Sequence, residues 1–182
     1  MKPPIIVASA LSLGVLTKLV DLTIDDDVNL GQFGYLLSIS YGLIMVYTIE
    51  SIVELSSLVL AVIIAVISAG KIDNIFHGVG VGTALAGILL LGIPQVNQGT
   101  FLLFLTAALL DEFTSDLADV GRTPKYLRNF FRLRPFLEIA ALIYSIYVGY
   151  IWFWSFIFIY DISYQLTNMI LRKRQGIQGC WE

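Results

Sequence analysis

The chain has 182 residues, of which 57% are hydrophobic and 14% are charged, with a formal net charge of −3. Soluble domains carry about a quarter charged residues, so this composition favours a surface that faces lipid. The slight acidic excess argues against a nucleic-acid-binding protein, because such proteins need a basic surface to contact phosphates. We expect an all-α, polytopic, multi-pass protein of the cell membrane, with residues 1–182 forming one transmembrane helical domain.

Five apolar blocks set the expected order of membrane spans. A span needs about 20 apolar residues, because a helix rises about 1.5 Å per residue and the hydrocarbon core is about 30 Å thick. Two of the blocks would be about 55 Å long as single helices, which is too long for one span. In chain order the blocks are Pro4–Val20, Phe33–Gly70, Gly78–Pro94, Thr100–Thr114 and Phe136–Leu171.

We expect each long block to form a hairpin of two short helices, which gives about seven transmembrane helices in total. The first hairpin should turn near Glu50 and Ser51. The second should turn near Gly149, where tyrosine and tryptophan residues gather as in an interfacial aromatic belt. If each long block is instead one tilted helix, the total falls to five.

Basic residues predict the orientation, because lysine and arginine in short loops favour the cytoplasmic side. One basic cluster precedes the last apolar block and another follows it. With seven helices both clusters can lie in the cytoplasm, which places the N-terminus outside and the C-terminus inside. The segment 115–135 then forms a cytoplasmic interfacial loop or helix, with Lys125, Arg128 and Arg132 on one face.

The same orientation places most acidic residues on the cytoplasmic side. Glu112, Asp116 and Asp119 follow an i, i+4, i+7 spacing, so a continuing helix places them on one face. Three like charges on one stripe repel each other, and a divalent cation or a basic ligand would offset that repulsion. Oxygen-rich sites suit Mg²⁺, which binds through carboxylates and substrate phosphates. The alternative is a solvated helix end, where acidic residues are ordinary.

Two further segments combine a cation with a carboxylate at a helix end. Lys18 precedes Asp21 by three residues, and Asp25 follows Asp21 one helical turn later. A second segment contains Lys71, Asp73 and His77, the only histidine in the chain. A lone histidine is more often a structural residue than a ligand, and the chain has no His/Cys cluster that would suit zinc.

Asp161 lies inside the last apolar block, where an ionisable residue is costly and suggests a function. Its expected partner is Lys18, Lys71 or a bound cation, and the alternative is a structural pair. The glycine-rich segment 78–87 does not end in Lys-Ser or Lys-Thr, which excludes a P-loop. Its small residues instead predict close packing between two helices.

The spacings Asp21-x-x-x-Asp25 and Glu112-x-x-x-Asp116 resemble the paired acidic motifs of intramembrane prenyltransferases. The resemblance covers only these two short patterns. The asparagine usual in the first motif is absent, and the chain is shorter than such enzymes usually are. We therefore do not assign the chain to that family.

Together the patterns favour an integral membrane enzyme, of transferase type, that acts on a lipid phosphate or diphosphate at the cytoplasmic face. The expected catalytic residues are Lys18, Asp21, Lys71, Asp73 and Asp116. The expected Mg²⁺ ligands are Asp21, Asp25, Glu112, Asp116 and Asp119. The expected substrate-binding residues are His77, Arg122, Lys125 and Arg128. The alternatives are a cation or proton-coupled transporter or channel, or a membrane subunit without chemistry of its own.

Overall fold

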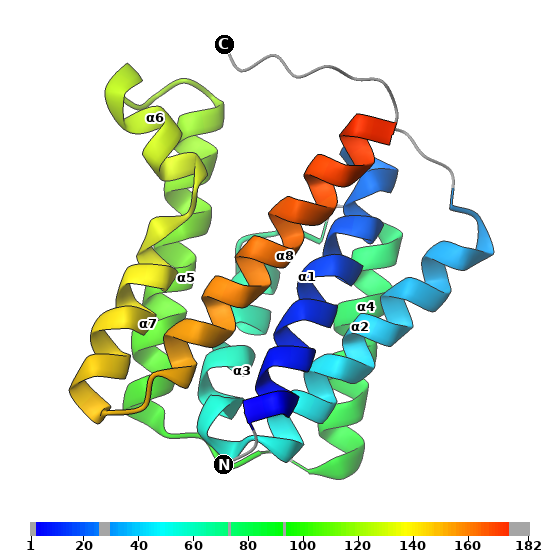
Figure 1. Cartoon of the computed structure of the whole chain (residues 1–182), viewed down its shortest axis with the longest axis vertical. Helices are drawn as coiled ribbons and strands as arrows, with labels where there is room; N and C mark the ends of the chain where they lie inside the picture. The colour runs from blue at the N-terminus through cyan, green and yellow to red at the C-terminus, as the bar shows by residue number, and fades with distance from the viewer. Residues whose placement is uncertain (1–2, 26–29, 73, 93, 175–182) are drawn as a thin grey trace.

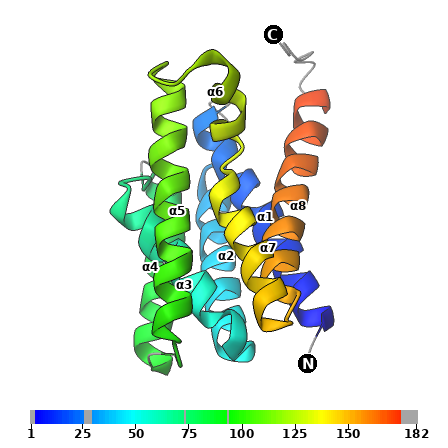
Figure 2. The same ribbon diagram turned by 90° about the vertical axis from the view of Figure 1, so that its left-hand side faces the viewer.

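The computed structural model describes residues 3–25, 30–72, 74–92 and 94–174, apart from the side chains of residues 22–25 and 174. These residues form eight α-helices and no strand, which confirms the all-α class (Figures 1 and 2). The helices are α1 (Pro3–Asp25), α2 (Gln32–Ser51), α3 (Val53–Ser68), α4 (Ile75–Leu91), α5 (Gln98–Asp119), α6 (Lys125–Arg132), α7 (Pro135–Val148) and α8 (Trp152–Arg174).

Apart from the eight-residue α6, the helices alternate in direction along the chain (Figure 1). As a result α1, α3, α5 and α8 end where α4 and α7 begin, and the short α6 lies at this same end. We call it the α6 end of the bundle. The alternation brings the C-terminal residues of α1, α3 and α5, where the acidic segments were expected, to one end of the molecule.

Both predicted hairpins are confirmed. The first long block breaks at Ile52, between α2 and α3. The second breaks after α7 at Gly149, which has a φ of 68°. Glycine adopts this left-handed conformation without the steric penalty of a Cβ, and the amide of Tyr150 closes the turn by donating to the carbonyl of Ser145 at 3.0 Å.

The helices pack closely where glycines remove side chains from the contact. The closest pairings are α1 with α8, α2 with α4 and α3 with α5. A Cβ placed on Gly80 of α4 would lie 2.0 Å from Cζ of Tyr41 on α2, and one on Gly42 would lie 2.4 Å from the carbonyl oxygen of Gly80. The prediction that the segment 78–87 supports close helix packing is therefore confirmed for Gly80.

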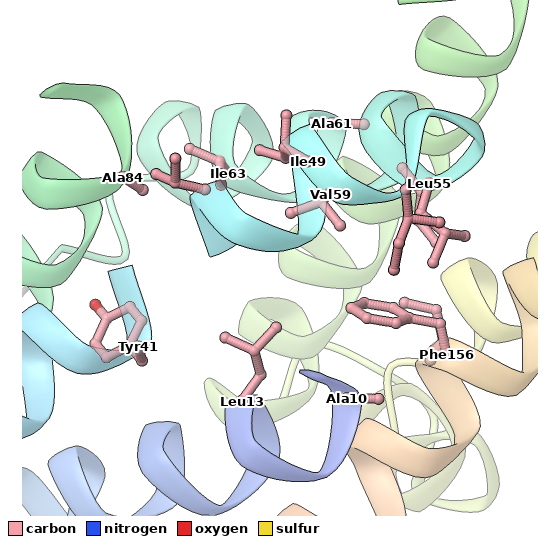
Figure 3. Packing of buried hydrophobic residues seen from close by; sticks show 14 of the residues in the cluster. Ala10, Leu13, Tyr41, Ile49, Leu55, Val59, Ala61, Ile63, Ala84 and Phe156 are labelled. Carbon is pink, nitrogen blue, oxygen red and sulfur yellow. The ribbon is translucent and has the colours of Figure 1, made fainter. Parts of the chain in front are cut away.

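A single apolar core fills the middle of the bundle (Figure 3). Leu13 of α1, Leu55 of α3 and Phe156 of α8 are buried there together with Tyr41 of α2 and Ala84 of α4. Figure 3 shows these side chains converging from five different helices. This core fixes the relative positions of the helix ends that carry the polar residues.

Two of the described helices are long and apolar enough to cross a membrane, by length and composition alone. They are α1 over Pro3–Asp21 and α2 over Gln32–Ser51. The helices α3, α4 and α7 are apolar but have only 16, 17 and 14 residues. The structure therefore contains a helix at each of the seven predicted spans. Of the described helices, only α1 and α2 meet the length and composition expected of a membrane span.

Candidate functional site

The carboxylate of Asp21 is the centre of a polar cluster between α1, α4 and α8. One of its oxygens lies 2.5 Å from Nε2 of His77, and the other accepts a hydrogen bond of 2.5 Å from the hydroxyl of Tyr164. The side chains of Asp21 and His77 are 17% and 15% exposed. The pair is thus half-buried, and its hydrogen bonds operate where water screens them less than at the surface.

Tyr41 and Lys18 complete this cluster. The Tyr41 hydroxyl donates a hydrogen bond of 2.9 Å to the carbonyl of His77 and lies 3.5 Å from Nδ1 of the same residue. Lys18 is 2% exposed, and its Nζ lies 5.3 Å from the centre of the Tyr164 ring, within the range of a cation–π interaction. The charge of Lys18 also acts on Asp21. We call Lys18, Asp21, Tyr41, His77 and Tyr164 the Asp21 cluster.

In the Asp21 cluster, both ring nitrogens of His77 face a polar group: Nε2 faces Asp21, and Nδ1 faces the Tyr41 hydroxyl. A neutral His77 that carries its proton on Nε2 donates to Asp21 and leaves Nδ1 as an acceptor facing the Tyr41 hydroxyl. A carboxylate in this position fixes the tautomer and the orientation of the imidazole. The arrangement can accept and return a proton.

A second pair lies at the same end of the bundle. Lys71, just after α3, forms an ion pair and hydrogen bond with Asp116 of α5. Their side chains are 30% and 51% exposed, so this pair is more accessible than the Asp21 cluster. Lys71 lies in the short connection from α3 to α4, and His77 lies in the first turn of α4. This part of the chain therefore contributes one basic group to each pair.

The other acidic residues of α5 each have their own partners in the chain. Arg134 contacts Glu112 at 3.0 Å, and Arg132 donates to Asp119 at 2.9 Å. Asp111 accepts hydrogen bonds from the amides of Phe136 and Leu137 and so caps the start of α7. Among the described residues there is no group of three acidic, histidine or cysteine side chains placed to hold a metal.

These contacts correct one expectation about the acidic stripe of α5. The repulsion along Glu112, Asp116 and Asp119 is offset by cations from three different segments of this chain, namely Arg134, Lys71 and Arg132. A metal is therefore not needed to stabilise the stripe. The Mg²⁺ site itself stays a prediction, because Asp73 and the side chain of Asp25 lie outside the described residues.

The predicted substrate-binding residues divide between two places. His77 belongs to the Asp21 cluster, whereas Arg122, Lys125 and Arg128 lie on or beside α6. Arg122 and Lys125 are exposed, and Nε of Arg128 is buried without a hydrogen-bond partner in the structure. The helix predicted within 115–135 is confirmed as α6.

Several residues of the site were not expected from the sequence. Tyr41 and Tyr164 lie far from Asp21 in the chain, and only the fold brings them together. Arg134 belongs to the basic cluster that precedes the last apolar block, and no separate role was expected for it. Its φ of 52° is the one left-handed non-glycine backbone among the described residues, and such strain is often found at functional positions.

The two lysines expected as partners of Asp161 contact other groups: Lys71 pairs with Asp116, and Lys18 lies against Tyr164. The charged groups that act on Asp161 most strongly are Glu138, Asp111 and Arg134. A bound cation as the partner of Asp161 stays a prediction.

Comparisons with protein-family models, with curated proteins and with solved structures found no match. The class that the fold and the site define is an all-α helical bundle with a histidine–carboxylate cluster and a lysine–carboxylate pair at one end.

Proposed function

We propose that the chain is a seven-span integral membrane enzyme that acts on a lipid phosphate or diphosphate at the α6 end of the bundle, on the cytoplasmic side. The observation that carries the proposal is the pairing of Lys71, in the connection from α3 to α4, with Asp116 and of His77, in the first turn of α4, with Asp21.

The exposed surface of the helices supports insertion in a membrane. Large apolar side chains face outward from helices on different sides of the bundle, such as Leu43 of α2, Leu90 of α4, Ile146 of α7 and Met169 of α8, with exposed fractions of 55%, 85%, 71% and 63%. In water each would forfeit about 25 cal/mol per Å² of apolar area, and a lipid environment removes that penalty. The short helices α3, α4 and α7 cross a bilayer if it thins locally or flanking residues snorkel.

The enzymatic part of the proposal rests on an exchange of partners at Lys71 and Asp116. The Lys71 ammonium attracts a phosphate oxygen as it attracts the Asp116 carboxylate, so a substrate phosphate would displace Asp116 from the ion pair. Asp116 would then be free to hold a Mg²⁺ ion that accompanies the phosphate, and Asp73 would be a further candidate ligand. The pair thus keeps both groups neutralised until substrate arrives.

The Asp21 cluster would act on a proton. His77, oriented by Asp21, is placed to take a proton from an attacking hydroxyl group, and Lys71 with Mg²⁺ would stabilise the negative charge on the departing phosphate. Lys18 is too buried to reach a substrate at the surface. We assign it to holding Tyr164 and Asp21 in place.

An apolar groove between α5 and α7 offers a place for the lipid tail. It has a volume of about 850 Å³ and extends from Gly99 and Tyr147 to Leu110 and Phe136. The end of the groove at Leu110 and Phe136 lies beside Asp111, which accepts a hydrogen bond from the amide of Phe136. Phe136 also follows Arg134 by two residues. A lipid in this groove would carry its head group to the α6 end.

The apolar core favours an enzyme over a transporter. A transported ion needs polar groups along its path, but Leu13, Leu58 and Phe156 fill the middle of the bundle. The buried hydroxyls of Ser38 and Thr48 bond to carbonyls of their own helix, those of Gly34 and Ile44.

The test is turnover of lipid phosphates and diphosphates by the purified chain in lipid nanodiscs, with Mg²⁺ or with EDTA. We expect Mg²⁺-dependent release of phosphate or diphosphate with at least one acceptor. His77→Gln should reduce the rate constant about 100-fold or more, because general-base catalysis contributes about that much. Glu50→Gln, at the opposite end, is the matched control and should leave turnover unchanged. Equal turnover by wild type and His77→Gln would refute the proposed role of His77.

A further inference from the structure

A cavity of about 510 Å³ lies at the end of the bundle opposite α6, away from the Asp21 cluster. It is formed by the beginnings of α3, α5 and α8 and by the end of α7. Its size is within the range of small-molecule sites, about 300–1,000 Å³. The residues that give it chemical character are Glu54, Asn97, Thr100, Tyr144, Tyr150 and Phe153.

Three aromatic rings line this cavity at steep angles to one another. The ring of Phe153 meets that of Tyr144 at 5.1 Å and 72°, and that of Tyr150 at 5.4 Å and 73°. The rings therefore pack edge to face against one another, and all three contribute to the cavity lining. Aromatic side chains that line a cavity are a usual means of binding quaternary ammonium groups.

Among the described residues that line the cavity, Glu54 is the only charged one, and it is negative. It is exposed at the start of α3, and its charge reaches Tyr150 across the cavity. Burial, with a smaller contribution from the Glu54 charge, raises the pKa of Tyr150, so the phenol stays neutral near pH 7. One carboxylate beside neutral aromatic rings gives the cavity a net negative potential.

Hydrogen bonds hold the walls in place without a ligand. The Tyr144 hydroxyl lies 2.6 Å from that of Thr100, whose amide donates to the side chain of Asn97 at 3.0 Å. The amide of Asn97 in turn donates to the hydroxyl of Ser57 at 3.0 Å. A cavity whose walls are already ordered loses less conformational entropy when it binds a ligand.

We propose that this cavity binds an organic ammonium cation, either as a free small molecule or as the head group of a lipid. A metal ion fits less well, because Mg²⁺ and Ca²⁺ need several oxygen ligands and the lining has one carboxylate. An anionic ligand would be repelled by Glu54. This site shares no residue with the Asp21 cluster or with the Lys71–Asp116 pair, although Tyr144 lines both this cavity and the apolar groove between α5 and α7.

The probe is choline chloride, titrated into the full chain in nanodiscs of phosphatidylglycerol and followed by calorimetry, with sodium chloride as the ionic-strength control. We expect saturable binding of choline and none of sodium. Glu54→Gln should weaken choline binding at least about fivefold, as expected for loss of one charge near the surface. Glu50→Gln, which removes a carboxylate just outside the cavity, should bind choline as the wild type does.

Two substitutions of Tyr150 test the contribution of the aromatic ring to choline binding separately from that of the Glu54 charge. Tyr150→Phe keeps the ring and should retain binding, whereas Tyr150→Leu should weaken it about threefold or more. Absence of saturable binding, or equal binding by wild type and Glu54→Gln, would overturn the proposal.

Nanodiscs of phosphatidylcholine distinguish the two sources of the cation. If the site takes a lipid head group, choline should bind more weakly there than in phosphatidylglycerol, because the lipid competes. If the site takes a free cation, the two affinities should agree. Since neither titration involves turnover, a failed choline experiment leaves the proposed enzymatic activity to its own test.

Discussion

Replacing Gly80 by alanine tests how closely α2 and α4 must approach to position Tyr41 on His77. The new Cβ would lie 2.0 Å from Cζ of Tyr41, whereas carbon atoms in contact prefer about 3.5–4.0 Å. The Tyr41 ring would have to move by about 1.5 Å to relieve this contact. Its hydrogen bond of 2.9 Å to the His77 carbonyl would then be lost.

The expected magnitude follows from three effects. Overpacking of a core costs about 1–3 kcal/mol, and a lost buried hydrogen bond costs about 1 kcal/mol. Alanine recovers up to about 1 kcal/mol of helix propensity. We therefore expect Gly80→Ala to lower the free energy of unfolding by about 1–3 kcal/mol and to reduce turnover as well, because His77 loses its contact with Tyr41.

Gly82 on the same helix provides the matched control. A Cβ at Gly82 meets no atom within 4 Å, so Gly82→Ala should leave the free energy of unfolding unchanged or raise it by up to about 1 kcal/mol. Denaturant unfolding in detergent, followed by circular dichroism, measures both variants. If Gly80→Ala and Gly82→Ala had the same stability, the close packing of α2 against α4 would be refuted.

Three further substitutions test other parts of the structure. Asp111→Ala removes the acceptor for the amides of Phe136 and Leu137 and should lower the free energy of unfolding by about 1–2 kcal/mol, with the exposed Asp119→Ala within about 0.5 kcal/mol of wild type in the same experiment. Arg134→Gly relieves a left-handed φ but leaves the buried Glu112 unpaired, so we expect it to lower the free energy of unfolding by about 3 kcal/mol. The double change with Glu112→Gln should restore part of this loss, and no restoration would show that the ion pair is unimportant. In a Cys180→Ser background, Arg122→Cys should react with an impermeant thiol reagent only after cell lysis and Glu50→Cys should react in intact cells, and the reverse pattern would contradict the proposed orientation.

The helices could be predicted from the sequence because they follow from physical limits on length. A block of 36 or more apolar residues exceeds one bilayer crossing, and Gly149 and the polar Glu50-Ser51 mark where the chain turns. The structure has its breaks at these two places. The helix α6 was predictable as well, because Lys125, Arg128 and Arg132 recur with helical spacing.

The contacts of the site could be predicted only in part. The sequence pointed to Lys18, Asp21 and His77, which lie together, and to Lys71 and Asp116, which pair. The sequence could not show that Arg132 and Arg134 form ion pairs with Asp119 and Glu112 of α5, because these pairs depend on how α6 folds back along α5. Tyr41 and Tyr164 gave no local signal, since tyrosines in apolar helices are ordinary core residues and only tertiary packing points them at His77 and Asp21.

The most direct test of the proposed function is binding of a lipid diphosphate to the purified chain in nanodiscs, titrated with and without Mg²⁺. Wild type and Lys71→Met are compared, with Lys125→Met as the control that removes an exposed cation from α6. If phosphate displaces Asp116 from Lys71, Mg²⁺ should tighten lipid binding in wild type, and Lys71→Met should weaken binding at least about tenfold while Lys125→Met changes it little. Lipid binding that is independent of Mg²⁺ and equal in all three proteins would contradict the partner exchange on which the proposal depends.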